Sequence, residues 1–211
     1  MKQHSDFNRR SSGKRIVLTG GPGVGKTTII RALQELKYEV REEVFTKLFD
    51  EAQRQGRFND RFLHSPELIH DLLSAQKKLE AQPTVTQFLF LDRSRIDIWG
   101  FSKSMGITPF VEDQGELEAG EYDLIFLLEP LPAKYYDQNL IRRQNYEESL
   151  EHHLSVTENY LMYLNEKGLD PKTCLIKVPF YDLNPLVSTL ERTHFILNEV
   201  ASRLPHERKT E

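Results

Sequence analysis

Short apolar runs alternate with longer amphipathic segments along the chain. The apolar runs have the length of β-strands, and the third and fourth are nearly continuous, as in strands covered on both faces. The runs lie at 15–19, 38–42, 86–91, 122–129 and 173–179, and the amphipathic segments at 26–36, 44–55, 66–81, 95–105, 146–167 and 185–203. This pattern predicts a three-layer α/β fold, in which helices cover both faces of a mainly parallel five-stranded sheet.

Three segments fall outside this pattern. Residues 111–123 (VEDQGELEAGEYD) contain six acidic residues and two glycines, which favours a solvated surface insert over a metal or partner site. The ends at 1–13 and 205–211 carry too few apolar side chains to offset the entropy lost on ordering, so we expect disordered tails. Residues 14–204, which include the acidic segment, are predicted to form one domain.

Composition narrows the setting in which the protein works. Of its 211 residues, 38% are hydrophobic and 28% charged, which suits a soluble globular domain. No stretch approaches the ~20 apolar residues of a membrane span, so we expect a cytoplasmic protein that is not transmembrane. The net charge of −4 gives no indication of nucleic-acid binding. Cys174 is the single cysteine, which excludes an intramolecular disulfide.

The stretch GGPGVGKT, from Gly20 to Thr27, matches the pattern G-x-x-x-x-G-K-[ST] between an apolar strand and a helix. Such glycines allow backbone N–H groups to surround phosphate oxygens, and the start of the following helix adds its positive dipole. We therefore expect ATP to bind here, with GTP as the alternative. The candidate nucleotide-binding residues are Gly21, Pro22, Gly23, Val24, Gly25, Lys26, Thr27 and Thr28. For Thr28, capping or packing is the alternative role.

Lys26 is expected to contact the β- and γ-phosphates, and the Thr27 hydroxyl to ligate Mg²⁺. Asp92 follows an apolar strand downstream of the loop, in a Walker B arrangement, and is expected to bind Mg²⁺ directly or through water. Arg93 and Arg95 add positive charge at the same edge of the sheet, where they could stabilise phosphoryl oxygens. Surface salt bridges are the alternative for both arginines.

Asp92-Arg93-Ser94 resembles the Asp/Glu-Arg-Ser/Tyr motif of P-loop nucleoside and nucleotide kinases. In those kinases the second strand ends in a carboxylate that touches the acceptor, and this chain offers Glu42 and Glu43 in that place. The resemblance favours Glu43, which would act as a general base towards a hydroxyl. A helix-start glutamate that interacts with the helix dipole is the alternative.

P-loop kinases also carry a basic helical lid that closes over the phosphates, and the resemblance suggests Arg142 or Arg143 for this role. A solvated helix end is the alternative. The sequence EHH at 151–153 could suggest a metal site, but adjacent side chains point in different directions on a helix, so we predict a solvated face. After the last strand, Phe180 or Tyr181 either stacks on the base or belongs to the core.

Five segments together resemble the small AAA-type P-loop ATPase domain of two families. One is the ribosylnicotinamide kinase portion of NadR, and the other is the nucleotide-binding domain of the TRPL translocation defect proteins, which bind GTP and phosphoinositides. The resemblance covers 14–203 and rests on GGPGVGKTT, REEVFTKLF, FLDRSRIDIWGFSKSMG, DQNLIRRQNYEE and VPFYDLNPLVSTLERTHFIL. It implies nucleotide and Mg²⁺ roles for Lys26, Thr27 and Asp92, and adds Glu43, Arg93, Asp97, Arg142 and Arg192 as site residues.

Two of these positions leave alternatives open. Asp97 either faces the acceptor pocket or is a helix-N-terminal acid, and the ring of Trp99 lines a substrate pocket or the core. The resemblance does not by itself assign ribosylnicotinamide as the substrate.

Two hypotheses follow for the function. The first is an Mg²⁺- and ATP-dependent phosphotransferase, acting on a small hydroxyl or phosphate acceptor, with Lys26, Asp92, Arg93, Glu43 and Arg142 as catalytic residues. The second is a regulatory switch that responds to ATP or GTP and binds a protein or phosphoinositide partner. A motor ATPase is a third reading, which the lack of an obvious helical appendage argues against.

Overall fold

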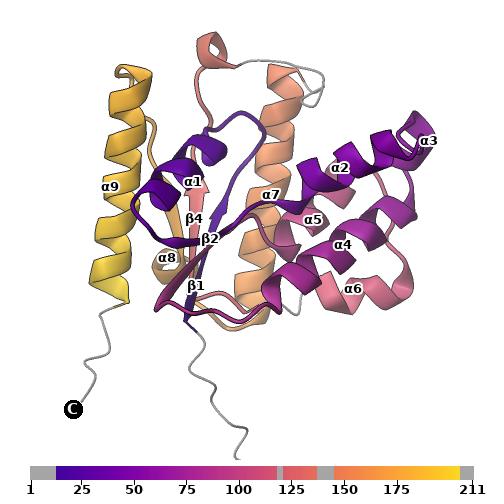
Figure 1. Cartoon of the computed structure of the whole chain (residues 1–211), viewed down its shortest axis with the longest axis horizontal. Helices are drawn as coiled ribbons and strands as arrows, with labels where there is room; N and C mark the ends of the chain where they lie inside the picture. The colour runs from indigo at the N-terminus through magenta and orange to yellow at the C-terminus, as the bar shows by residue number, and fades with distance from the viewer. Residues whose placement is uncertain (1–12, 118–120, 137–144, 205–211) are drawn as a thin grey trace, which may run out of the picture.

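The computed structural model describes residues 13–117, 121–136 and 145–204. Five parallel strands form one sheet in the order β2-β3-β1-β4-β5 (Figure 1). The strands are β1 (Lys14–Thr19), β2 (Glu39–Arg41), β3 (Phe88–Asp92), β4 (Leu124–Leu128) and β5 (Leu175–Val178). The prediction of a mainly parallel five-stranded sheet is confirmed, and all four strand pairings are parallel.

β1 lies in the middle of the sheet. The chain first places β2 and β3 on one side of it and later β4 and β5 on the other. Leu18 is in register with Asp92 of β3, and Thr19 with Leu127 of β4. In open α/β sheets, ligands bind at the carboxyl ends of the strands where the strand order reverses. Here that point is the end of β1, where the glycine-rich loop begins.

Two pairs of helices cover the sheet, with α9 and α7 on opposite sides in Figure 1. Successive residues of a strand point to opposite faces, so Ile16 packs with Leu33 and Ile196 on one face, while Val17 packs with Tyr160 on the other. The first pair is α1 (Lys26–Glu35) and α9 (Pro185–Arg203), and the second is α5 (Arg95–Ser104) and α7 (Tyr146–Glu166). Within the described residues, no helix combines the length and apolar character that a membrane crossing requires.

A third core cluster joins further helices to α5, at the right of Figure 1. Leu68 and Leu72 are fully buried there against Val44 and Ile98. The Ser65 side chain accepts a hydrogen bond from the Leu68 N–H, as its position before a proline indicates. The cluster includes residues of α2 (Val44–Arg54), α3 (Asp60–Leu63) and α4 (Pro66–Glu80), and α6 (Val111–Leu117) lies against α4 and α5.

The acidic segment differs from its prediction, because part of it forms α6 and packs against α4. Asp113 is only 6% exposed, and its carboxylate lies 3.0 Å from His70 Nδ1. Glu116 forms an ion pair with Lys77 at 3.0 Å. A fully solvated insert is therefore wrong for this part of the segment. The sequence pattern also missed α3, the 3-10 helix η1 (Ala133–Tyr135) and α8 (Pro171–Cys174), which are too short to show a helical period.

Candidate active site

The glycine-rich loop leaves β1 at Gly20 and enters α1 at Lys26. Gly25 has a φ of 86°, a left-handed conformation that glycine adopts without strain, and it precedes the first residue of α1. Gly21 lies against α7, because an added Cβ would be 2.8 Å from the Ser149 carbonyl oxygen. One glycine therefore supplies a backbone conformation, and the other permits a close approach between the loop and a helix.

Lys26 turns its ammonium group into the loop. Its Nζ donates hydrogen bonds to the carbonyl oxygens of Gly20 (3.0 Å) and Gly21 (2.9 Å). Burial, together with the neighbouring Arg93, lowers the pKa of Lys26 to about 7. A bound triphosphate would favour the charged lysine, since an opposite charge nearby stabilises the ionised form.

Two side chains of α7 bind the backbone of the loop. Ser149 Oγ donates a hydrogen bond to the Pro22 carbonyl oxygen at 2.8 Å. The Gly21 N–H donates to His153 Nδ1 at 3.1 Å. The prediction of a solvated face for the sequence EHH is wrong for its two histidines, which are only 6% and 9% exposed. Both histidines belong to the site, and sequence reasoning missed them.

Helical spacing carries a signal that locates this buried face. Ser149, His153, Val156 and Tyr160 follow one another at intervals of three or four residues, so they share one side of α7. Val156 and Tyr160 are fully buried. His153 thus continues this buried stripe towards the loop, and His152, four residues before Val156, lies beside it.

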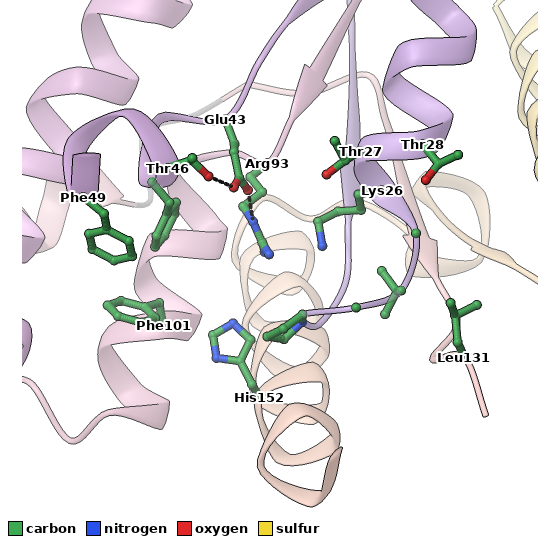
Figure 2. Close-up of a pocket in the computed structure, with 15 residues that line it drawn as sticks. Lys26, Thr27, Thr28, Glu43, Thr46, Phe49, Arg93, Phe101, Leu131 and His152 are labelled. Carbon is green, nitrogen blue, oxygen red and sulfur yellow. Dashed lines mark hydrogen bonds and ion pairs between the residues drawn. The ribbon is translucent and has the colours of Figure 1, made fainter. Parts of the chain in front are cut away.

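A cavity of about 470 Å³, here called the central cavity, opens beside the loop (Figure 2). Residues 22–28, which include the exposed Thr27 and Thr28, line one side of it. Glu43, Arg93 and His152 line the other parts, together with the rings of Phe45, Phe49 and Phe101. The central cavity therefore joins a phosphate-binding backbone to a carboxylate and a guanidinium.

A second cavity of about 560 Å³, here called the side cavity, adjoins the central cavity. Phe49, Phe101 and His152 line both of them. The side cavity extends to α3 through Phe58 and Leu63. The two cavities together give a small molecule room to lie next to the phosphate loop.

Glu43 and Arg93 form an ion pair within the central cavity, with 2.9 Å between Arg93 Nε and a Glu43 carboxylate oxygen (Figure 2). Burial tends to raise the pKa of Glu43, but the charges of Arg93 and Lys26 outweigh it and hold the pKa below its usual range. Glu42 points elsewhere: it is exposed and accepts a hydrogen bond from Gln34 at 3.1 Å. Of the two candidate glutamates, only Glu43 lines the central cavity.

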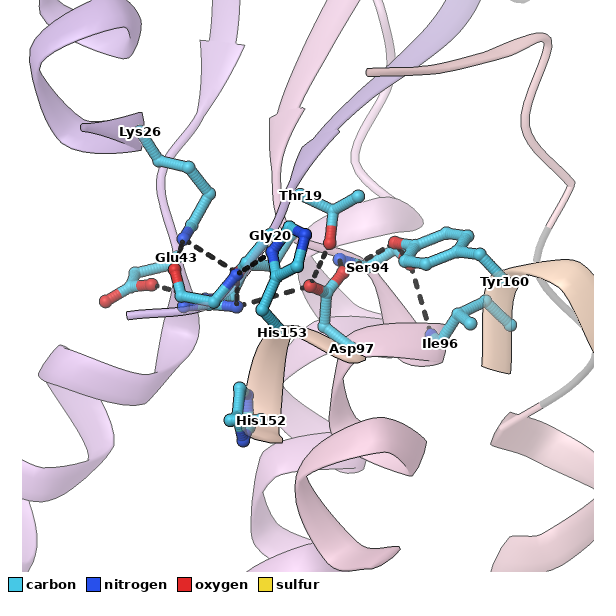
Figure 3. Close-up of polar contacts among 12 residues, drawn as sticks. Thr19, Gly20, Lys26, Glu43, Ser94, Ile96, Asp97, His152, His153 and Tyr160 are labelled. Carbon is cyan, nitrogen blue, oxygen red and sulfur yellow. Dashed lines mark hydrogen bonds and ion pairs between the residues drawn. The ribbon is translucent and has the colours of Figure 1, made fainter. Parts of the chain in front are cut away.

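Asp97 does not line the central cavity, and its carboxylate lies among the side chains of Thr19, Ser94 and Tyr160 (Figure 3). It is 1% exposed and accepts hydrogen bonds from the Ser94 N–H at 2.8 Å and the Tyr160 hydroxyl at 2.6 Å. Ser94 and Asp97 form a capping box at the start of α5. A further contact, 3.2 Å from Arg93, holds that guanidinium in place. The structure thus favours the helix-N-terminal alternative for Asp97.

Asp92 ends β3 and is 4% exposed. Burial and the nearby Glu43 charge raise the pKa of Asp92 to about 7. Its Oδ1 is buried and has no hydrogen-bond partner among the described residues. Within the same residues, no group of three or more His, Cys, Asp or Glu side chains is arranged to hold a metal. A cation near Asp92 would therefore need other ligands, such as phosphate and water oxygens.

Several predicted residues lie away from the central cavity. Arg95 forms an ion pair with Glu80 at 3.1 Å, which agrees with the salt-bridge alternative, although the pair is largely buried and not at the surface. Trp99 packs, partly buried, against the third core cluster. Arg142 and Arg143 lie outside the described residues.

A third cavity of about 470 Å³, here called the outer cavity, lies on the other side of the loop and has mainly apolar and aromatic walls. Phe180 lines it, whereas Tyr181 does not. Arg192 of α9 also lines it and donates a hydrogen bond to the Val24 carbonyl oxygen at 2.8 Å. Arg192 therefore supports the shape of the loop from the side of the outer cavity.

A model of the AAA domain family matches residues 15–165, so the chain belongs to this family. A search of proteins with curated functions found no match. Among solved structures, NadR in complex with NR is similar with a TM-score of 0.65 and 19% identity, over 94% of this chain and 54% of NadR. The chain thus spans about half the length of NadR.

Two kinases that the chain matches over nearly the whole length of their own chains share the fold. Thymidylate kinase from Candida albicans matches with a TM-score of 0.56 and 14% identity, over 93% of this chain and 94% of its own. Deoxyadenosine kinase from M. mycoides matches with a TM-score of 0.51 and 16% identity, over 89% of this chain and 98% of its own. At sequence identities below 20%, the similarity establishes the P-loop fold only. The reaction that the protein catalyses depends on the residues of its own site.

Proposed function

We propose that the protein is a kinase, which binds ATP with Mg²⁺ at the phosphate loop and transfers the γ-phosphoryl group to a small acceptor. One observation carries the proposal: the central cavity extends from the loop directly to Glu43 and Arg93. A hydrolase needs space only for a water molecule beside the phosphates, whereas the central cavity adjoins the side cavity of about 560 Å³, which is the size of a small-molecule site. The carboxylate and guanidinium on its wall are the groups that phosphoryl transfer to an acceptor requires.

The loop and its neighbours form the donor side of the site. Backbone N–H groups of the loop and the start of α1 would bind the triphosphate, with Lys26 at the β- and γ-phosphates. Mg²⁺ would be held by Thr27, by Asp92 directly or through water, and by phosphate oxygens. The buried Asp92 Oδ1, which lacks a partner among the described residues, fits this role. When bound, the metal supplies charge neutralisation at the phosphates.

The outer cavity would take the base of the nucleotide, because it shares Gly25 and Thr28 with the central cavity. Phe180 offers an aromatic face for stacking. No carboxylate is present among the described lining residues, so no single side chain there accepts both N–H donors on the edge of guanine, as a carboxylate would. We therefore favour ATP over GTP as the donor.

The acceptor would lie in the central and side cavities. Glu43, which is ionised at neutral pH, would accept the proton of an attacking hydroxyl. Arg93 would stabilise the negative charge on the phosphoryl oxygens as it redistributes. The rings of Phe45, Phe49 and Phe101 would exclude water from the reacting groups. Arg142, in the segment after β4, stays our candidate for a lid residue.

ADP formation, measured without an acceptor and then with a panel, tests this proposal. The names of the similar proteins suggest nucleosides, including ribosylnicotinamide, and nucleoside monophosphates for the panel. Ribose and glycerol are added as simple hydroxyl acceptors. We expect at least one acceptor to raise ADP formation about tenfold or more, with an equal amount of phosphorylated product. Slow ADP formation that no acceptor changes would contradict the kinase and favour the regulatory switch.

The Lys26→Ala variant supplies the control for site-dependent turnover. It should bind no ATP by calorimetry, whereas Lys78→Ala, which removes an exposed lysine from α4, should bind ATP as the wild type does. ATP-dependent activity that survives in Lys26→Ala would show that another site, or a contaminant, produces the ADP.

A further inference from the structure

His152 is a buried histidine that the proposed mechanism does not use. It is 6% exposed and lines both the central and the side cavity. In Figure 2 its ring lies below Arg93 and beside Phe101, whose ring centroid is 6.0 Å from that of the histidine. An imidazole in this place contacts whatever molecule spans the two cavities.

The contacts of Ser104 determine which ring nitrogen of His152 carries the proton. Ser104 Oγ lies 2.9 Å from the Phe101 carbonyl oxygen and 2.9 Å from His152 Nδ1. The carbonyl can only accept, so the single hydroxyl proton of Ser104 is used there. For the second contact to be a hydrogen bond as well, His152 Nδ1 must carry a proton and donate it to Ser104 Oγ. This arrangement makes Nε2 the unprotonated nitrogen, a hydrogen-bond acceptor.

The surroundings keep this imidazole neutral. Burial and the charges of Arg93, Lys26 and His153 lower the pKa of His152 to about 3. The acidic groups that line the side cavity are Asp60 of α3 and Glu148 and Glu151 of α7. No hydrogen bond to Nε2 is present among the described residues.

We propose that His152 selects an acceptor that places a hydroxyl at Nε2 over one that places a phosphate there, by accepting a hydrogen bond from that hydroxyl. This inference rests on the proposed kinase function and names the class of its acceptor. A fully ionised phosphate has no proton to donate to Nε2. Its negative charge would also repel the lone pair of this nitrogen. The attacking hydroxyl gives its proton to Glu43, so His152 binds a second hydroxyl, as on a sugar.

The charges of the two cavities agree with this choice. Outside the phosphate loop, Arg93 is the one permanent cation among their described lining residues, and it already pairs with Glu43 and Asp97. Three carboxylates line the side cavity. An acceptor that brings its own phosphate would therefore meet more negative than positive charge.

NMR tests the protonation state without any turnover. In protein with ¹⁵N-labelled histidine, long-range ¹H–¹⁵N correlations report which imidazole nitrogen is protonated. We expect His152 to show Nδ1–H and an unprotonated Nε2, unchanged from about pH 8 to about pH 5, with the Ser104→Ala variant altering this pattern. Addition of a phosphorylated nucleoside should shift the Nε2 signal less than addition of the nucleoside. An Nε2–H tautomer in the wild type would overturn the inference, whatever the enzyme does.

Kinetics with matched variants test the selection itself. His152→Phe keeps the ring volume but removes the acceptor atom, and we expect it to raise the KM for a nucleoside about tenfold, which corresponds to about 1.4 kcal/mol. His152→Gln can place an amide oxygen near the position of Nε2 and should restore most of that loss. His194→Gln changes an exposed histidine on α9 and should leave the KM within about twofold. The dissociation constant of ATP should change less than about twofold in all three.

The outcomes separate this inference from the proposed function. An analogue that lacks the second hydroxyl should show no difference between wild type and His152→Phe. If His152→Phe raises the KM for nucleosides and for their monophosphates equally, or changes neither, the selection by His152 is refuted while the kinase stands. If the wild type phosphorylates no acceptor of the panel, the proposed function is refuted first.

Discussion

Replacement of Glu43 by glutamine is the perturbation that best separates chemistry from structure. The Glu43 carboxylate pairs with Arg93 at 2.9 Å and accepts a hydrogen bond from Thr46 Oγ1 at 2.8 Å. An amide can direct its oxygen to Arg93 and its NH₂ to the threonine hydroxyl, so both contacts survive and only the charge is lost. We therefore expect a loss of stability of about 1–2 kcal/mol, since hydrogen bonds to charged groups contribute about 1.5–3 kcal/mol.

Catalysis should suffer far more than stability. Loss of a positioned general base lowers a rate by about 10²–10⁴-fold, whereas about 1–2 kcal/mol lowers the Tm of a chain of this size by about 2–8 °C. ATP affinity should not fall, because the change removes a negative charge near the triphosphate. The assays are acceptor-dependent turnover, thermal unfolding and calorimetry with ATP.

The neighbouring Glu42 supplies a matched control for the same chemical change. Glu42 is exposed and pairs with Lys47 only at 3.5 Å, so Glu42→Gln should leave turnover within about twofold of the wild type. If folded Glu43→Gln keeps turnover within about tenfold, Glu43 is not the general base. If both variants lose activity equally, the effect lies in the local charge rather than in the cavity.

Three further predictions concern the loop and its supports. Lys26→Ala should abolish calorimetric ATP binding, because the other loop contacts lack its charge. Gly21→Ala should lower the free energy of unfolding by about 1–3 kcal/mol, since its Cβ would lie 2.9 Å from the Cβ of His153; an unchanged urea midpoint would refute this close approach. Burial lowers the pKa values of His152 and His153 to about 3 and about 4, so the unfolded chain binds more protons below about pH 6.5. Stability should therefore fall as the pH decreases from about 6.5 to about 4, by about 1.4 kcal/mol per pH unit for each histidine, and His153→Asn should reduce this slope in urea unfolding at several pH values.

The sequence predicted the sheet and the long helices well, because their periodicity is strong. β3 and β4 are buried on both faces and read as continuous apolar runs, and helices such as α9 show their periodicity over several turns. The glycine-rich loop was predicted equally well, because phosphate binding requires its glycines, lysine and threonine at fixed positions. Short helices such as α8 carry no such pattern, and the acidic segment gave no indication that Asp113 would be buried against His70.

The other walls of the cavities were harder to predict, because long-range contacts determine them. The resemblance of Asp92-Arg93-Ser94 to a kinase motif predicted that Arg93 belongs to the site. It could not show that the Asp97 carboxylate caps the start of α5 and does not face the central cavity. The sequence predicts a solvated face for His152 and His153, because adjacent polar residues are typical of the exposed side of a helix. Their burial follows from the contact of α7 with the loop, which lies more than a hundred residues earlier in the chain.

The destination of the γ-phosphoryl group tests the central claim most directly. ³¹P NMR of the protein with Mg²⁺, ATP and each nucleoside in turn distinguishes a phosphomonoester product from inorganic phosphate. We predict that the γ-phosphate signal is replaced by a phosphomonoester signal with at least one acceptor, and that Lys26→Ala forms none. Conversion of ATP to ADP and inorganic phosphate alone, with every acceptor unchanged, would contradict the assignment of this protein as a kinase.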